Sequence, residues 1–294
     1  MIGLYDYLAK KLGKITLTRL PVHLNRFWGE SQVWLIRTDL FWRGISIKAL
    51  AAASLLFDAQ ETGRLKKTTE VLVCSSANFA IGTALLLPDF GNFRLTAIVP
   101  ESIDSKKASR LLSLGAKIIK VASGALALAE QYAKDPLVVY LNQYANPAMT
   151  KGVEIYLAPF VYEQVKFNAA VLPLGTGGTA IGFNAYIQEH NIDATMVGVN
   201  LVNGEKVSGM RDKKRQEEVS LPWQKNIQHL VSVTREEAVT CTRALLAADI
   251  MVGTSTGAGV VGFDKWMWHQ IQEGLIKEPI TAVLPCPDSA YAFA

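Results

Sequence analysis

Two patterns alternate along most of this chain: short runs rich in Val, Ile and Leu, and longer stretches with helical apolar spacing. Parallel strands buried on both faces form such apolar runs, so the alternation predicts an α/β fold of mostly parallel, twisted sheets covered by helices. The expected strands are residues 33–37, 70–74, 94–99, 117–121, 137–141, 169–173, 195–199, 228–233 and 280–285. The expected helices are residues 45–62, 77–87, 105–114, 125–134, 153–165, 179–189, 235–247 and 257–273, after an amphipathic helix within residues 1–14. With 294 residues, half of them hydrophobic, the chain can bury a sizeable core, which excludes a disordered or fibrous protein.

Composition excludes several classes of partner. The formal net charge is only +4 and no long basic run accompanies it, so we expect no nucleic-acid partner. The three cysteines form no CxxC pair and the four histidines are widely scattered, which favours reduced thiols and no metal site. The sequence contains neither an export signal nor an uncharged apolar run of about 20 residues. We therefore expect a cytoplasmic protein that does not contact a membrane.

The most informative segment is residues 169–182, where an apolar strand passes directly into a glycine-rich turn and then a helix. The turn consists of Gly175, Thr176, Gly177, Gly178 and Thr179. Glycines let the backbone turn sharply, so that successive N–H groups and the helix N-terminus converge on one anion, usually a phosphate. The turn therefore predicts a phosphate site, although a strand-to-helix turn without a ligand would use the same residue types.

The same turn also fits a second kind of site. Gly175, Gly177 and Ala180 satisfy the GxGxxG/A fingerprint of dinucleotide-binding folds. That fingerprint is expected in the first βαβ unit, with an acidic residue after the following strand. Here it lies beyond the middle of the chain, and Asn200 follows the next expected strand. A dinucleotide site is therefore the weaker hypothesis.

Polar, hydroxyl-rich loops occur in three other places, at residues 74–80, 253–258 and 287–289. An open α/β sheet places its ligand at the carboxyl ends of strands, where such loops would lie. Helix capping alone would also explain the serines, so both interpretations stay open on these residues. A polar segment with Pro147, residues 142–151, indicates a crossing between two lobes.

Taken in order, these segments resemble the motifs of fold-type II pyridoxal-phosphate enzymes, and most closely the cysteine synthase and cystathionine β-synthase family. The family's GTGGT is intact at residues 175–179, and its TSGNTG loop is similar to residues 75–80. Its lysine motif NPxGSxKDR occupies residues 41–50, which keep Ser46 and Lys48. Its QxxNP, GxSSGA and PDSxxxY elements are similar to residues 143–147, 253–258 and 287–291. The resemblance implies a two-lobed, tryptophan synthase β-like fold, with a large lobe from residues 1–48 and 146–294 and a small mobile lobe from residues 49–145.

The resemblance also implies pyridoxal 5'-phosphate as cofactor and assigns roles to individual residues. The cofactor would be bound by Lys48, Asn78, Gly175, Thr176, Gly177, Gly178, Thr179 and Ser289. Lys48 would hold it covalently and act as the catalytic base, Asn78 would meet the ring hydroxyl, and Ser289 the ring nitrogen. A serine there would leave the pyridine largely unprotonated and favour β-elimination over transamination. The substrate carboxylate would be bound by Ser75, Ser76, Ala77, Phe79 and Gln143.

The chain departs from the family pattern around the substrate. Phe79 stands where the family has a threonine, and Ala77 where it has a glycine. Because Phe79 cannot donate a hydrogen bond and adds bulk, we expect a pocket different from that for O-acetylserine. The resemblance implies a homodimeric enzyme of amino-acid biosynthesis that performs β-elimination or β-replacement on an O-activated serine. A narrower hypothesis is O-phosphoserine with an amino-acid nucleophile, in diaminopropionate synthesis for a siderophore.

Two other functions stay open. Serine or threonine deamination, or cysteine desulfhydration, would use the same fold and the same Lys48. A catalytically degenerate paralogue could instead serve as a binding or regulatory subunit. The altered residues around Lys48 and Asn78 favour that last hypothesis, whereas the intact GTGGT and the retained lysine count against it.

Overall fold

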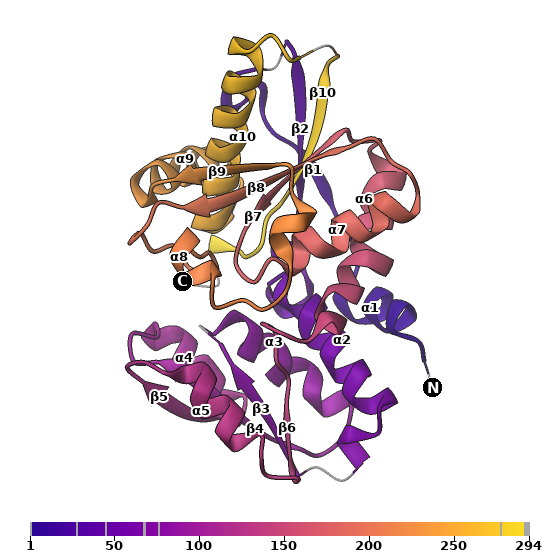
Figure 1. Cartoon of the computed structure of the whole chain (residues 1–294), viewed down its shortest axis with the longest axis vertical. Coiled ribbons are helices and arrows are strands. Elements are labelled where there is room, and N and C mark those ends of the chain that lie inside the picture. The colour runs from indigo at the N-terminus through magenta and orange to yellow at the C-terminus, as the bar shows by residue number, and fades with distance from the viewer. Residues whose placement is uncertain are drawn as a thin grey trace.

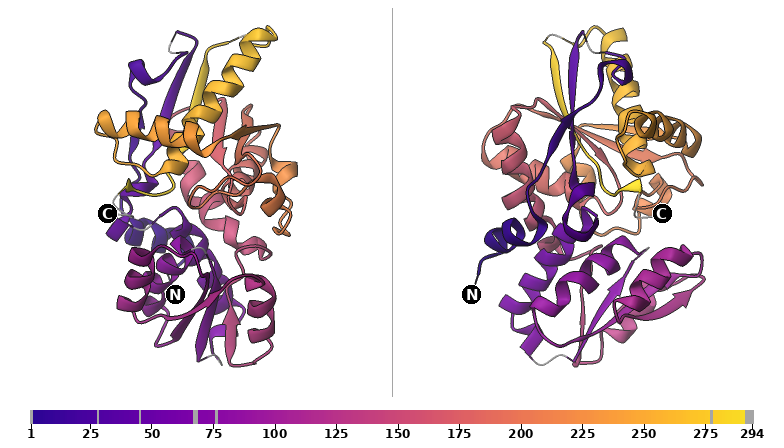
Figure 2. Two further views of the ribbon diagram at one scale, coloured as in Figure 1. Left: turned by 90° about the vertical axis from the view of Figure 1, so that its left-hand side faces the viewer. Right: turned by 180° about the vertical axis from the view of Figure 1, so that it is seen from behind.

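The computed structural model of this chain describes residues 2–27, 29–44, 46–66, 69–75, 77–276 and 278–290. Their strands form two sheets in separate halves of the molecule (Figure 1), and the view from behind shows the same separation (Figure 2). This arrangement confirms the predicted α/β class with mostly parallel sheets. None of the described helices is both long enough and apolar enough to cross a membrane.

The larger sheet has the strand order β1-β2-β10-β7-β8-β9. Its strands are β1 (Leu17–Arg19), β2 (Ser31–Ile36), β7 (Ala169–Pro173), β8 (Thr195–Leu201), β9 (His229–Val233) and β10 (Ile280–Pro285). Every neighbouring pair is parallel except β1 with β2. Strand β10 lies between β2 and β7, and Ile280 pairs with Ser31 although the two are far apart in sequence.

The smaller sheet has the order β5-β4-β3-β6, and all its pairs are parallel. Its strands are β3 (Glu70–Cys74), β4 (Arg94–Pro100), β5 (Lys117–Val121) and β6 (Val138–Tyr140). These strands come from one continuous stretch of chain, and those of the larger sheet come from the two flanking stretches. The exact lobe boundaries, 48/49 and 145/146, stay a prediction, as does the mobility of the small lobe.

Helices connect most of the parallel strands. They are α1 (Leu4–Leu12), α2 (Lys48–Glu61), α3 (Asn78–Leu86), α4 (Ser105–Ser113), α5 (Ala125–Tyr132), α6 (Ala158–Gln164), α7 (Gly178–Glu189), α8 (Lys213–Gln216), α9 (Arg235–Ala247) and α10 (Thr254–Gln272). Local sequence fixes where some of these helices begin. Thr234 and Glu237 form a reciprocal capping box at the N-terminus of α9, and the Asp104 carboxylate caps the N-terminus of α4.

Helix α2 joins the two halves. It is rich in alanine and apolar nearly all round, which is typical of a helix buried on every side. It packs against α1, α3 and the turn at Pro147–Thr150. The backbone N–H of Gly152 donates to Ser54 Oγ at 2.8 Å, and any larger residue at 152 would crowd the Leu50 carbonyl. One apolar core therefore runs from the smaller sheet through α2 into the larger half.

Candidate active site

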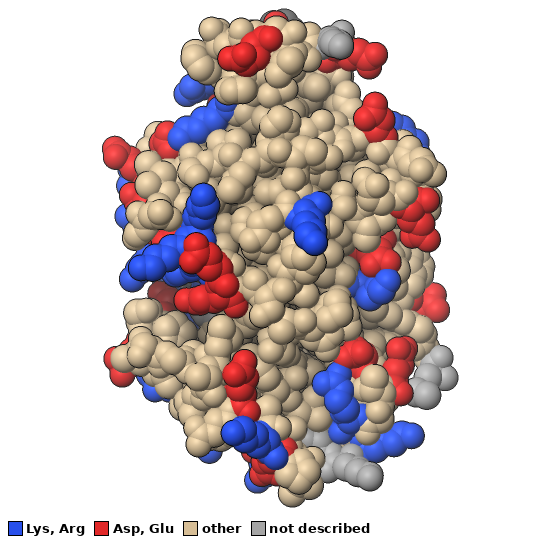
Figure 3. Space-filling view, in the orientation of Figure 1, with Lys and Arg blue, Asp and Glu red and all other residues tan. Residues whose placement is uncertain are grey.

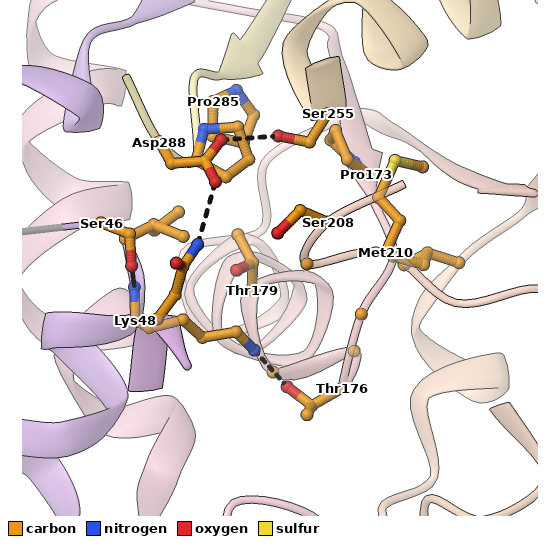
Figure 4. Close-up of a pocket in the computed structure, with 18 of the residues that line it drawn as sticks. Ser46, Lys48, Pro173, Thr176, Thr179, Ser208, Met210, Ser255, Pro285 and Asp288 are labelled. Atoms are coloured by element: carbon orange, nitrogen blue, oxygen red, sulfur yellow. Dashed lines mark hydrogen bonds between the residues drawn. The ribbon is translucent and has the colours of Figure 1, made fainter. Parts of the chain in front are cut away.

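A cavity lies where the loops after β7 and β10 meet the N-termini of α2, α3, α7 and α10. Figure 4 shows its lining, which includes Lys48, Asn78, Thr176, Ser255 and Asp288. The carboxyl ends of the two parallel strands and the positive ends of four helix dipoles thus face one space. Such an arrangement suits an anionic ligand.

Lys48 is the first residue of α2, and its side chain enters this cavity. Its backbone N–H donates to Ser46 Oγ at 3.2 Å, and its amine Nζ donates to Thr176 Oγ1 at 3.0 Å. Burial, and to a smaller extent the nearby positive charge of Arg211, lower the pKa of Lys48 to about 8. Near neutral pH the Lys48 amine is therefore uncharged in a fraction of the molecules. Only the uncharged form can attack an aldehyde or accept a proton.

The glycine-rich turn at residues 175–179 forms the cavity wall beside Lys48. Gly177 has φ +74°, and a Cβ there would overlap the Trp223 side chain. A Cβ at Gly175 would overlap the Gly209 carbonyl, and one at Gly178 would overlap Met149. The backbone N–H groups of Gly177, Gly178 and Thr179 donate to none of the described residues. The glycines are thus required by close packing, and the turn keeps N–H groups available for an anion.

Asp288 lies on the opposite side of the cavity. Its side chain is buried, and the residue is 2% exposed. Asn78 Nδ2 donates to Asp288 Oδ2 at 2.9 Å, and Ser255 Oγ donates to Asp288 Oδ1 at 3.2 Å (Figure 4). Burial raises the pKa of this carboxyl, against the opposing effects of the Lys107 charge and of both hydrogen bonds.

Ser289 is placed differently from its neighbour. Its Oγ donates to the Met251 carbonyl at 3.2 Å, and its backbone bridges to Val252. Ser289 does not belong to the cavity lining, whereas Asp288 does. The structure therefore brings Lys48, Asn78 and the glycine-rich turn together as expected, but it leaves Ser289 beside them rather than facing them.

The expected substrate loop follows β3. The Ala77 N–H donates to Ser75 Oγ at 3.0 Å, and Ala77 has φ +126°, a conformation that is strained for any residue except glycine. Gln143 Nε2 donates to the Cys74 carbonyl at 2.9 Å and so fastens the lobe crossing to this loop. Phe79 is 1% exposed and belongs to the apolar core. The prediction for Ser76 lies outside the described residues.

A larger cleft of about 780 Å³ adjoins the first cavity, and the two share residues 208–210 of their linings. Ser75 lies in its wall, together with four basic and two acidic residues: Lys107, Lys206, Arg211, Arg215, Asp104 and Glu218. The Arg211 guanidinium lies 4.9 Å from the centre of the Tyr144 ring, and Nη1 bonds to Glu218 at 2.8 Å. Figure 3 shows basic and acidic side chains side by side at a hollow between the two halves, near α8.

The loop at residues 287–289 and the PDSxxxY resemblance both included Asp288, but they assigned the role to Ser289. No sequence motif pointed to Arg211 or Lys107. Arg211 and Lys107 come from loops and helices far apart in sequence. They line one cleft only because the two halves face each other across it.

Comparisons with known proteins bear on this site. Residues 12–285 match a family model described as "Pyridoxal-phosphate dependent enzyme". Cysteine synthase A of Salmonella typhi is 27% identical, with 94% of this chain and 92% of that protein covered. Cystathionine beta-synthase of Dictyostelium discoideum is 25% identical over 82% of this chain and 53% of that protein.

Two solved structures share the fold. O-ureido-L-serine synthase superposes with a TM-score of 0.84 and 18% identity, covering 97% of this chain and 92% of that one. A hydrogen sulfide-producing enzyme of Fusobacterium nucleatum superposes with a TM-score of 0.82 and 17% identity, covering 99% of each chain.

Proposed function

The chain belongs to the pyridoxal-phosphate dependent enzyme family, and from this premise we propose that it catalyses β-replacement on an O-activated serine. The family match confirms the predicted cofactor, pyridoxal 5'-phosphate. The similarity to cysteine synthases over most of the chain supports β-replacement as the reaction type. The family match spans the glycine-rich turn and favours pyridoxal phosphate over a dinucleotide as its ligand.

The residues present fit the cofactor. The three free N–H groups of the glycine-rich turn would take its phosphate, and the Lys48 amine would hold its aldehyde carbon. Asn78 Nδ2 carries two N–H groups; one binds Asp288 and the other would serve the ring hydroxyl. When bound, pyridoxal phosphate supplies an electron sink for negative charge at the substrate α-carbon.

The observation that carries the proposal is the environment of Lys48. A buried lysine with a pKa lowered to about 8, held 3.0 Å from Thr176, has a neutral amine available near physiological pH. Once the substrate has displaced it, the Lys48 amine would take the substrate α-proton at Nζ. Departure of the β-substituent and addition of a nucleophile would follow in the same closed site.

The cleft supports a substrate with an anionic β-substituent. Four basic side chains against two acidic ones give its walls a positive surplus, and Arg211 is close enough to Lys48 to affect its pKa. A phosphate on the serine oxygen would interact with these charges more strongly than an acetyl group would. O-phosphoserine is therefore our candidate, with an amino acid as nucleophile and a diaminopropionate-type product.

The proposal also includes the oligomeric state of the protein and its cellular location. Trp268 on α10 is 61% exposed, and Ile271 and Leu275 also present apolar side chains to solvent. Exposed apolar side chains along one helix and its end are typical of an interface, which supports a homodimer. The proposed location is the cytoplasm, where the cysteines would stay reduced. Mass photometry at nanomolar to micromolar concentrations would show the dimer as twice the 32.1 kDa chain mass.

The decisive experiment is to reduce the purified enzyme with borohydride and map the peptide that carries the pyridoxyl group. The label should fall on Lys48, and Lys48→Ala should lose both the visible absorption and the activity. Lys134→Ala, at an exposed helix end, is the matched control and should retain both. Incubation with O-phosphoserine or O-acetylserine and a set of amino acids, followed by mass spectrometry, would then identify the product.

The same experiment distinguishes the alternative functions, because each predicts a different result. Release of pyruvate or sulfide without an addition product would support deamination or desulfhydration instead. An unlabelled Lys48, or full biological activity of Lys48→Ala, would overturn catalysis and favour a regulatory subunit.

A further inference from the structure

We propose that the hydrogen bond between Lys107 and Ser208 holds the cleft closed during the reaction, and that it thereby makes β-replacement prevail over net elimination. Lys107 comes from the half with the smaller sheet, and Ser208 comes from the half with the larger sheet. The inference rests on the proposed function, because it concerns what happens after the β-substituent has left. Both are positioning residues in this role, since neither has to touch the substrate.

The bond lies on the side of the molecule where the cleft opens, near α8 (Figure 3). Helix α4, which carries Lys107, lies at the edge of the smaller half that is nearest to α8, on the side away from α1 (Figure 1). Lys107 Nζ donates to Ser208 Oγ at 2.9 Å, and both residues line the cleft. Because α2 joins the halves on the other side, a bond at α4 acts on a long lever arm and restrains opening.

The burial of Lys107 makes the contact reversible. The residue is 4% exposed, and burial lowers the pKa of its amine against the opposing effects of the Asp288 and Asp104 charges. Removing an ammonium group from water is costly, and the bond to Ser208 and the attraction of these carboxylates offset that cost. Opening of the cleft would return the group to water. The Lys107–Ser208 bond can therefore break and re-form in each turnover.

The segment that carries Ser208 is suited to follow the smaller half. Within residues 204–210, Gly204 has φ +88° and Gly209 has φ +82°, and a Cβ at either would meet nothing within 4 Å. The backbone N–H groups of residues 206–209 donate to none of the described residues. Few backbone hydrogen bonds therefore oppose movement of this segment, and the bond from α4 fixes where it lies.

Helix α4 also contacts both segments that position the cofactor. The Gly209 carbonyl, next to Ser208, packs so closely against Gly175 of the glycine-rich turn that no Cβ fits there. Arg110, on the same helix, donates from Nη2 to the Arg43 carbonyl at 2.6 Å, shortly before Lys48 begins α2. Closure at α4 would therefore hold the cleft and the cofactor segments in one arrangement.

Closure matters because elimination leaves an unsaturated product. Lys48 takes the α-proton, the β-substituent departs with the electron pair of its bond to Cβ, and a double bond forms between Cα and Cβ. A nucleophile already in the cleft can add to Cβ, after which Cα takes a proton back from Lys48. If the cleft opens first, the unsaturated product leaves, and water converts it to pyruvate and ammonia. A cleft that stays closed therefore favours replacement.

The first experiment measures opening of the cleft without activity. Cys74 is buried and lines the cleft, whereas Cys241 is half-buried on α9 and serves as an internal reference. The holoenzyme is treated with iodoacetamide, and the labelled peptides are quantified by mass spectrometry. Lys107→Met should raise the labelling rate of Cys74 about tenfold, since it removes a hydrogen bond from a charged group, and should leave Cys241 unchanged.

Matched variants isolate the bond. Ser208→Ala should raise the labelling rate of Cys74 as Lys107→Met does, and Lys107→Arg should stay near the wild type. Lys134→Met, at an exposed position, should have no effect. The double variant should label no faster than either single variant, because both changes remove the same bond. Equal labelling of Cys74 in the wild type and in Lys107→Met, or additive effects in the double variant, would overturn the proposed bond.

The second experiment measures the ratio of pyruvate to replacement product with O-phosphoserine and an amino-acid nucleophile. Lys107→Met should raise this ratio about tenfold, and Lys107→Arg should restore it. A partly unfolded variant would lower both products together, so the ratio distinguishes loss of closure from loss of structure. An unchanged ratio in a variant whose Cys74 reacts faster would overturn the link between closure and β-replacement.

The two experiments separate this inference from the proposed function. Failure of every serine derivative as substrate would overturn the proposed function and the role of closure in it, whereas labelling of Cys74 would still decide whether the Lys107–Ser208 bond closes the cleft. Equal labelling would overturn that bond and leave β-replacement intact.

Discussion

The glycine-rich turn after β7 and the substrate loop after β3 occupy equivalent places, each leading from a buried parallel strand into a helix, yet they are built in opposite ways. The first uses glycine where φ is positive, at Gly177, and packs so closely that no Cβ fits. The second places Ala77 at φ +126°, where glycine would be unstrained, and turns Phe79 into the core. The comparison teaches that the loop predicted to bind the cofactor keeps the family pattern, whereas the loop predicted to bind the substrate departs from it.

The largest expected effect is a loss of stability on truncation of Phe79. It distinguishes a residue that packs in the core from one that contacts the substrate. Truncation by Phe79→Ala should cost about 3–5 kcal/mol of unfolding free energy, since it empties a buried site. Urea denaturation measures that loss, and Phe79→Leu serves as the milder control. A stability near that of the wild type combined with a changed KM would show that Phe79 contacts substrate instead.

Gly177→Ala tests the cofactor loop. We expect a loss of about 2–4 kcal/mol and weaker cofactor binding, because the new Cβ meets Trp223 and the backbone has a positive φ. Gly204→Ala is the matched control: its φ is +88° but its Cβ would meet nothing within 4 Å. Thermal melts with and without cofactor compare the two variants, and equal losses would mean that backbone strain alone matters.

The pH dependence of cofactor capture tests whether the pKa of Lys48 is lowered. Only the neutral amine attacks the aldehyde, and the pKa is lowered to about 8, so the capture rate should rise about tenfold per pH unit below that value and level off above it. Stopped-flow absorbance on the apoenzyme measures this profile. Arg211→Gln removes a positive neighbour and should move the midpoint upward. A wild-type midpoint near the ordinary lysine value would refute the lowered pKa.

The smallest effect is expected at Ala77. Ala77→Gly should relieve a strain of about 1–3 kcal/mol, partly offset by the greater freedom of glycine in the unfolded chain. The net result should be a rise in unfolding free energy of about 1 kcal/mol, visible in the denaturation midpoint. Ala80→Gly, inside α3, is the control and should destabilise. A loss at both positions would show that Ala77 is not strained.

Sequence reasoning located the elements well where periodicity is strong. The strands at residues 70–74, 117–121, 169–173 and 280–285 have the predicted bounds, because short apolar runs between polar segments leave little choice of ends. Strand β1 was missed, since a three-residue antiparallel edge strand is too short to show a pattern. The helix expected at 153–165 begins as a π-helical turn, Val153–Leu157, before α6.

The site could be predicted only where a motif fixes the backbone. Lys48, Asn78 and the glycine-rich turn each begin a helix beside a strand end, so their convergence follows from the topology. Asp288 and Ser289 are neighbours beyond the end of a strand, and adjacent side chains in extended chain point to opposite sides. No pattern in the sequence says which of the two faces the cavity.

The position of β10 between β2 and β7 also sets an order of events during folding. Strand β2 joins β7, β8 and β9 in the larger sheet only through β10, which lies far from it along the chain. Such long-range pairing delays folding, and until it forms, the other strands expose unpaired edges. Because Asp288 follows β10, the cavity is complete only once this strand has been inserted. We therefore expect cofactor capture to follow the insertion of β10 rather than to precede it.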